Sequence, residues 1–323
     1  MTIEEVAPSL FRVEVPIPDN PLQSVNSYFL KSRDRNLIID TGMNLPECRL
    51  ALSSAISALQ IDLNKTDFFV THLHADHLAL ALHMASKNSR LYLNRTEFDL
   101  ISSPNGWEMY HDFYLKYGFP DDSLHQSEQH HPAKSIKPEL MQHFTPVEGD
   151  ETFLIGDYAF QCISTPGHSP GHLCLYEPSK KILISGDHIL FDITPNINSW
   201  PIMENALKEY LLNLDKVFSL DVELVLPGHR SIQTNHRRRI QGLKEHHRTR
   251  ANEVLAILEH GKKTAYQVAP LMTWDVSYAS WERFPIVQKW FAVGEALAHL
   301  KYLEAEGEAR SQVENGTVLF YKE

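Results

Sequence analysis

A dense run of metal-binding side chains stands in the sequence Thr-His-Leu-His-Ala-Asp-His, which ends at His77. His72 and His74 are two residues apart directly after an apolar run. In an extended segment, alternate side chains share a face, so both imidazoles can reach one ion. Asp76 and His77 follow where the chain is expected to bend into a helix, and they can point at a second ion nearby. Imidazole and carboxylate together suit zinc, iron or manganese rather than calcium or magnesium.

Three further candidate ligands each follow a predicted strand, beside a Gly or Pro turn. They are His168 in Thr-Pro-Gly-His-Ser-Pro-Gly-His, Asp187 in Ser-Gly-Asp-His and His229 in Leu-Pro-Gly-His. In layered α/β proteins, binding and catalytic sites assemble at the carboxyl ends of strands. The sequence therefore predicts that these three residues join the first cluster.

In this order of motifs the chain resembles the metallo-β-lactamase superfamily, whose signature is His-x-His-x-Asp-His followed by distant His, Asp and His. The resemblance distributes the seven ligands over two ions: His72, His74 and His168 on the first, Asp76, His77 and His229 on the second, and Asp187 bridging both. The two ions are expected to be zinc, with iron or manganese as alternatives. Asp40, which follows a strand, either supports the metal loop or is simply a turn residue.

Two ions held close together imply hydrolysis. A shared water would lose its proton near neutral pH, and the resulting bridging hydroxide would attack while one ion polarises the electrophilic oxygen. Asp76 and Asp187 are accordingly the predicted catalytic residues. His172 and His188 stand beside ligands and are expected to support the site.

The branch of the superfamily bears on the substrate. The motif around His168 and the sequence Gly-Asp-His-Ile after Ser185 resemble glyoxalase-II-like members, and the segment after His229 resembles lactamase-β-like hydrolases. A small-molecule ester, thioester or lactone is the favoured substrate. The alternatives are a metal-dependent single-strand endoribonuclease and, outside enzymes, a binding protein that acts through a C-terminal winged domain.

Residues 94–148 read as an insertion that could act as a lid. Five aromatic residues at helical spacing give it one apolar face, which either packs on its own domain or forms a wall over the metals: Trp107, Tyr110, Phe113, Tyr114 and Tyr117. The insertion also contains four histidines that we expect to be solvated: His125, His130, His131 and His143.

A basic run begins the C-terminal part of the chain. It reads as the solvated face of a long helix, with an RNA-binding or anion-binding stripe as the alternative, and comprises His236, Arg237, Arg238, Arg239, Lys244, Arg248 and Arg250. The overall net charge of −11 disfavours nucleic acid as the partner.

The elements that must position these residues alternate between strand and helix up to about Leu93, including a helix expected from about Leu78 to Lys87, and strands dominate after Gly149. This alternation predicts an α/β layered core. The resemblance implies a four-layer αββα sandwich over residues 1–234. Residues 235–323 are expected to form a helical, winged-helix-like domain ending in a hairpin at Asn315-Gly316, the dipeptide that best fits a type I′ turn.

The composition is that of an ordinary globular chain: 43% of the 323 residues are hydrophobic and 22% charged. Three scattered cysteines form no disulfide framework and are expected to be buried: Cys48, Cys162 and Cys174. The acidic N-terminus does not resemble a signal peptide, and no stretch is apolar enough to span a membrane. A cytoplasmic location is therefore expected.

Overall fold

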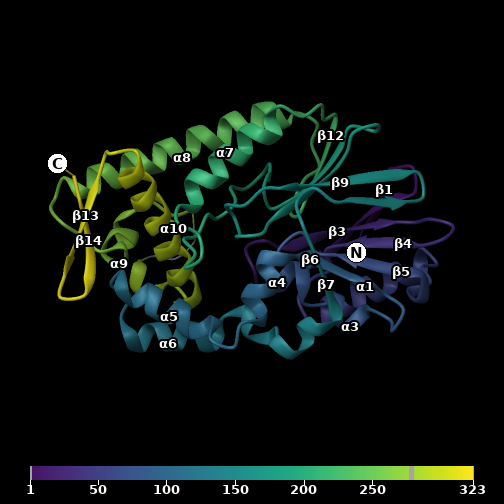
Figure 1. Ribbon diagram of the computed structural model, residues 1–323, viewed down its shortest axis with the longest axis horizontal. Coiled ribbons are helices and arrows are strands. Elements are labelled where there is room, and N and C mark those ends of the chain that lie inside the picture. The colour runs from purple at the N-terminus through teal and green to yellow at the C-terminus, as the bar shows by residue number, and fades with distance from the viewer. Residues whose placement is uncertain (1, 276–279, 323) are drawn as a thin grey trace.

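The computed structural model describes residues 2–275 and 280–322. Two β-sheets lie face to face, and helices cover their outer surfaces (Figure 1). This is the predicted α/β sandwich. A second group of helices, with a terminal hairpin, lies beside the sandwich.

The first sheet has seven strands in chain order. The first four strands pair antiparallel, and from the fourth strand to the seventh the pairing is parallel. Helix α1 (Pro46–Ala58) and later helices therefore connect one parallel strand to the next. The strands are β1 (Ile3–Ala7), β2 (Leu10–Pro16), β3 (Ser24–Leu30), β4 (Asn36–Ile39), β5 (Thr66–Phe69), β6 (Leu91–Asn94) and β7 (Phe144–Val147).

The second sheet has the order β12-β11-β10-β9-β8. Its strands pair antiparallel, except that β11 and β12 run parallel and are connected in the chain by helix α7 (Ala206–Phe218). The strands are β8 (Thr152–Ile155), β9 (Tyr158–Ser164), β10 (Leu173–Glu177), β11 (Ile182–Gly186) and β12 (Leu224–Pro227).

Three apolar cores hold these layers together. Phe69 of the first sheet and Phe160 of the second are both fully buried in the core between the sheets. Leu52 of α1 belongs to the core outside the first sheet, and Leu214 of α7 to the core outside the second. The central strands of each sheet are thus buried on both faces, as their nearly continuous apolar sequences predict.

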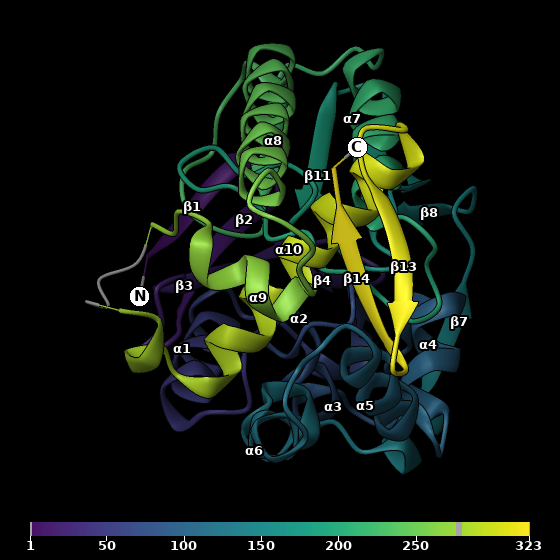
Figure 2. The same cartoon turned by 90° about the vertical axis from the view of Figure 1, so that its left-hand side faces the viewer.

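A fourth apolar core joins segments far apart in sequence. It packs α5 (Gly106–Lys116) and α6 (Asp121–His130) against three C-terminal helices and the hairpin (Figure 2). The C-terminal elements are α8 (His236–Leu258), α9 (Ala265–Val268), α10 (Ile286–Ala305), β13 (Arg310–Glu314) and β14 (Thr317–Tyr321). Asn315 and Gly316 both have positive φ, as the predicted type I′ turn requires.

Short elements complete the chain. They are the helices α2 (Ala75–Leu78), α3 (Ala81–Met84) and α4 (Arg95–Ser102), and the 3-10 turns η1 (Leu63–Lys65), η2 (Pro132–Ser135), η3 (Pro138–His143), η4 (Ala269–Leu271) and η5 (Trp281–Arg283). Among the described residues, no helix is both long and apolar enough to cross a membrane. The three cysteines are buried and free, as predicted.

Two expectations need correction. The single helix expected from about Leu78 to Lys87 is wrong, because α2 and α3 are separate short helices. The amide of Leu80 donates to the carbonyl of Gly42 at 3.1 Å instead of continuing the helical ladder. The end of the 94–148 stretch also contributes β7, the edge strand of the first sheet, so this stretch is not wholly an insertion.

Candidate metal centre

All seven predicted ligands meet between the two sheets. The segment that ends at His77 follows β5, His168 follows β9, Asp187 follows β11 and His229 follows β12. The carboxyl ends of four strands from two sheets therefore supply the side chains, as the sequence predicted.

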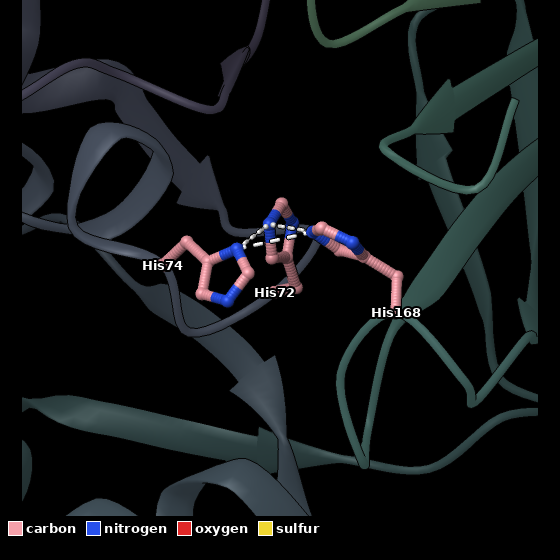
Figure 3. Close-up of side chains that lie close together, drawn as sticks. All are labelled: His72, His74 and His168. Atoms are coloured by element: carbon pink, nitrogen blue, oxygen red, sulfur yellow. Dashed lines mark hydrogen bonds between the residues drawn. The ribbon is translucent and has the colours of Figure 1, made fainter. Parts of the chain in front are cut away.

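The first group consists of His72, His74 and His168 (Figure 3). The Nδ1 atom of His74 lies 3.0 Å from Nε2 of His72 and 3.0 Å from Nε2 of His168. The two Nε2 atoms are 3.3 Å apart. A neutral imidazole has one lone-pair nitrogen, and three such nitrogens facing one point suit a tetrahedral transition metal with a fourth position open.

The second group consists of Asp76, His77 and His229. Nε2 of His229 lies 3.3 Å from Nε2 of His77 and 3.4 Å from Oδ2 of Asp76. Two imidazoles and one carboxylate again form a donor set suited to a transition metal.

Asp187 lies between the two groups. Its Oδ2 atom is 3.6 Å from Nε2 of His168 and 3.4 Å from Nε2 of His229, and its Oδ1 atom is 3.6 Å from Nε2 of His77. Oδ1 is buried without a hydrogen-bond partner among the described residues. A buried, unpaired carboxylate oxygen is costly unless a cation satisfies it, so the position of Asp187 fits a bridge between two ions.

Outer contacts fix the orientation of the imidazoles. Nδ1 of His77 lies 2.8 Å from the carboxylate of Asp40, and Nδ1 of His229 lies 2.7 Å from the carbonyl of Ser24. These partners leave the Nε2 atoms free to face the centre, the arrangement common to metal-binding histidines. Asp40 is thus both a support and a turn residue, since its φ is 56°.

The predicted supporting role of His172 agrees with its contacts. Its Nδ1 atom lies 2.8 Å from the hydroxyl of Thr165, and its Nε2 atom accepts from the amide of Asp187 at 3.1 Å. His188 is fully buried beside the ring of Tyr210. Neither histidine belongs to one of the groups that could hold an ion.

The electrostatics of the pocket favour cations. Burial and neighbouring imidazoles lower the pKa of His72 well below its ordinary value and that of His74 to about 3. Burial opposes charge on His77, yet nearby carboxylates, Asp40 foremost, raise its pKa to about 9. Burial likewise opposes charge on Asp187, but His229 and His77 hold its pKa well below the usual range. The group of His72 and His74 therefore offers neutral imidazoles, and the group of His77 stabilises positive charge.

Glu97 of α4 is a supporting residue that the sequence did not single out. It is fully buried and accepts hydrogen bonds from the hydroxyl of Ser169 and from the amide of Gly171 at 3.1 Å. It thereby ties down the loop that presents His168. Burial raises the pKa of Glu97 to about 8. A single glutamate in a helix carries no sequence signal for this long-range contact.

The aromatic face of α5 was expected either to pack within its own domain or to form a wall over the metals, and its residues differ in this respect. Tyr114 packs in the C-terminal core, with its ring centroid 4.4 Å from that of Trp290. Tyr110 instead lies 6.0 Å from the ring of Trp200, which in turn stacks 6.1 Å from the candidate ligand His74. The amino-terminal half of this face therefore approaches the metal centre through Trp200.

The insertion histidines differ from one another. The expectation that His131 is solvated is wrong: its ring packs 5.4 Å from Trp107, and burial lowers its pKa to about 4. His125, His130 and His143 are exposed, as predicted. His125 also meets His111 and Asp121 in a separate surface group with metal-ligand spacing. Ion pairs account for this surface group, since Asp121 lies 2.9 Å from His111 and 3.5 Å from His125.

The basic run is not a uniformly solvated face. Arg239 is half-buried and donates to the carbonyls of Leu190 and Ile193. Arg250 is buried against Glu253 and Glu295. His236 is buried as well. The expectation of solvation is therefore wrong for these three residues, because they face the sandwich and α10, whereas Arg237, Arg238 and Arg248 are exposed.

Comparisons with known proteins agree with this geometry. A sequence profile of the metallo-beta-lactamase superfamily matches residues 20–229, and a profile of the metallo-beta-lactamase-like C-terminal domain matches residues 251–323. A probable metallo-hydrolase of Bacillus subtilis is 26% identical over 99% of this chain and 98% of its own length. An atrochrysone carboxyl ACP thioesterase of Emericella nidulans is 23% identical over 81% of this chain and 68% of its own.

A solved structure extends the likeness to the whole chain. The metallo-beta-lactamase family protein of Thermus thermophilus is 26% identical and covers 99% of this chain and 100% of its own, with a TM-score of 0.84. The arrangement of the sandwich and of the C-terminal helices is thus shared by the two proteins.

Proposed function

The chain belongs to the metallo-beta-lactamase superfamily, and from this membership we propose that it is a dinuclear metal-dependent hydrolase of a small-molecule ester, thioester or lactone. The observation that carries the proposal is the position of Asp187 within 3.6 Å of both His168 and His229. One carboxylate between two sets of imidazoles is what a two-ion site requires.

We assign the ligands as the family motif orders them. The first ion would be held by His72, His74 and His168, and the second by Asp76, His77 and His229. Asp187, which lies near His168 and His229, would serve both. Zinc is the first choice, with iron or manganese as alternatives. The bound ions would supply Lewis acidity and make a water acidic enough to attack near neutral pH.

The protein's own residues supply position and charge. Asp76 and Asp187 are ionised in the buried pocket, because nearby histidines outweigh the effect of burial on their pKa values. Asp76 can also orient the attacking water by accepting a hydrogen bond from it, since only one of its oxygens is needed as a ligand. Trp200, seven per cent exposed, packs beside His74 and holds the ring of this candidate ligand in place.

A thioester is our first choice of substrate. The thioesterase relative and the glyoxalase-II-like sequence around His168 both favour it. An RNA substrate has less support, since Arg239 and Arg250 of the basic run are engaged within the protein.

The test combines metal analysis with a substrate panel. Purified protein should contain two transition-metal ions per chain and should hydrolyse members of a thioester, ester and lactone panel. Asp187→Ala should abolish turnover, while Asp215→Ala, which changes an exposed aspartate paired with Lys244, should not. Turnover of labelled single-stranded RNA alone, lost in Asp187→Ala, would replace this proposal with the nuclease. Protein without stoichiometric metal would overturn both.

A further inference from the structure

Helix α10 lies against the segment of residues 196–200, which passes beside the metal centre. The amide of Ser199 donates to the carbonyl of Gly294 at 3.1 Å. A Cβ atom at position 294 would collide with Oδ1 of Asn198 and would lie 2.7 Å from the hydroxyl of Tyr114. The absence of a side chain at Gly294 therefore lets the helix approach this segment closely.

A first route leads from α10 to His168. Glu295 is eight per cent exposed and accepts from the side-chain amide of Asn196 at 2.6 Å. The backbone carbonyl of the same asparagine lies 2.8 Å from Nδ1 of His168 and accepts a hydrogen bond from it. The position of Asn196 therefore sets the direction in which Nε2 of His168 points.

A second route leads from α10 to His74. The segment anchored at Gly294 continues directly into Trp200, whose ring stacks on the ring of His74 with an interplanar angle of 23°. The indole is seven per cent exposed and cannot move without disturbing the segment. Both routes end on ligands of the same ion.

The other ion has different supports. Its candidate ligands His77 and His229 are oriented by Asp40, which directly follows β4, and by Ser24 of β3. Helix α10 has no described hydrogen bond to either histidine. The contacts of α10 thus reach only His74 and His168, whereas Asp40 reaches His77 directly and His72 through the hydroxyl of Thr71, which lies 3.0 Å from Nδ1 of His72.

We propose that α10 is the outer support of one half of the metal centre, with Glu295 and Asn196 as positioning residues for the ion held by His72, His74 and His168. The inference rests on the proposed dinuclear site. It assigns the C-terminal helix a part in the chemistry, although no residue of α10 contacts the reacting atoms.

Arg250 explains how a buried carboxylate is tolerated in this position. Its guanidinium lies 3.5 Å from Glu295, is held by Glu253, and packs 4.6 Å from the ring of Trp274. A buried charge requires a partner with further hydrogen bonds. Helix α8 thus holds Glu295 in place, and Glu295 in turn holds Asn196.

The test measures the release of each ion from the full-length, zinc-loaded protein. A chelator removes zinc, and a metallochromic indicator follows the two release phases. Loss of an outer-shell partner typically weakens metal binding 10- to 100-fold, so Glu295→Leu should accelerate one phase by about that factor and leave the other unchanged. Glu295→Gln keeps an oxygen for Asn196 and should release zinc at nearly the wild-type rate.

Three further variants separate this role from general destabilisation. Glu253→Leu removes another partner of Arg250 without touching Asn196, and it should leave both phases unchanged. Asn196→Ala should reproduce the effect of Glu295→Leu, and the double variant should be no worse than either alone. Gly294→Ala, which displaces the segment from the helix, should accelerate the same phase. In the cobalt-substituted protein, only one of the two sites should change its visible spectrum.

The outcomes distinguish this inference from the function on which it rests. A wild-type protein that binds fewer than two ions contradicts the dinuclear site itself. Two ions bound normally, with Glu295→Leu changing neither phase or both phases equally, would overturn the role of α10 and leave the dinuclear site intact.

Discussion

Replacing Asp40 with asparagine should weaken the other half of the centre. Asp40 is one per cent exposed. Its Oδ1 atom accepts from the amide of Thr71 at 2.8 Å, and its Oδ2 atom contacts both the hydroxyl of Thr71 and Nδ1 of His77, each at 2.8 Å. Asparagine has the same shape and tolerates the left-handed backbone found here.

The substitution changes which nitrogen of His77 carries the proton. The oxygen of the new side-chain amide must still accept from the backbone amide of Thr71, so its NH2 group faces Nδ1 of His77. For Nδ1 to accept a hydrogen bond from this NH2 group, His77 must carry its proton on Nε2. That atom lies 3.6 Å from Asp187 and 3.3 Å from Nε2 of His229. A protonated Nε2 cannot bind a metal.

The expected loss is that of an outer-shell carboxylate, about 10- to 100-fold in affinity for one ion. This corresponds to about 1.4 to 2.7 kcal/mol. Titration of the metal-free protein with zinc, in competition with an indicator, should show the binding step of the His77 group weakened by that factor. The step of the His72 group should weaken too, because the hydroxyl of Thr71 joins Asp40 to Nδ1 of His72. If both constants stay at their wild-type values, the role given to Asp40 is wrong.

Asp67→Asn is the matched control. Asp67 is two per cent exposed and pairs with Arg35 at 2.6 Å, at the opposite end of β5. Its replacement removes a buried carboxylate from β5, the strand paired with β4 that precedes Asp40, without touching a histidine. It should lower the stability of the fold but leave both zinc constants unchanged. A similar loss of zinc affinity in the control would attribute the Asp40 effect to general destabilisation.

Three other outcomes are expected. Burial raises the pKa of Glu97 to about 8, so the fold favours its neutral form and loses stability as pH rises through that value. In metal-free Glu97→Gln, the melting temperature should therefore fall less between about pH 5 and 9 than in wild type; an equal fall argues against this titration. Alanine at Trp107 and Tyr110 should raise KM while the metal content stays at wild type, and unchanged kinetics would exclude a substrate wall. A Cβ atom at Gly316 would meet open space, but the backbone φ of 82° is unfavourable for alanine. Gly316→Ala should therefore lower the free energy of unfolding by about 1 to 2 kcal/mol without changing metal content. An unaltered denaturation midpoint would contradict the turn assignment.

The sequence by itself singled out the candidate ligands that the fold brings together, and it predicted the hairpin turn. Both depend on local patterns: alternation brings His72 and His74 onto one face, and Asn315-Gly316 suits two residues of positive φ. Most strands of the two sheets were likewise readable, because buried strands are short apolar runs, but β1 and β7 at the edges of the first sheet were not predicted. What the sequence left open at Asp40 was a choice between support and turn, and the structure shows that it is both.

Tertiary structure alone decided which residues hold the ligands in place. Glu97 contacts Gly171, 74 positions away, and Asn196 contacts Glu295, 99 positions away. It also divided the expected helix after His77, through the bond between Leu80 and Gly42. Such contacts arise from the packing of whole elements, and no local spacing encodes them. Short motifs therefore contain the candidate ligands, whereas the contacts that orient them exist only once the chain is folded.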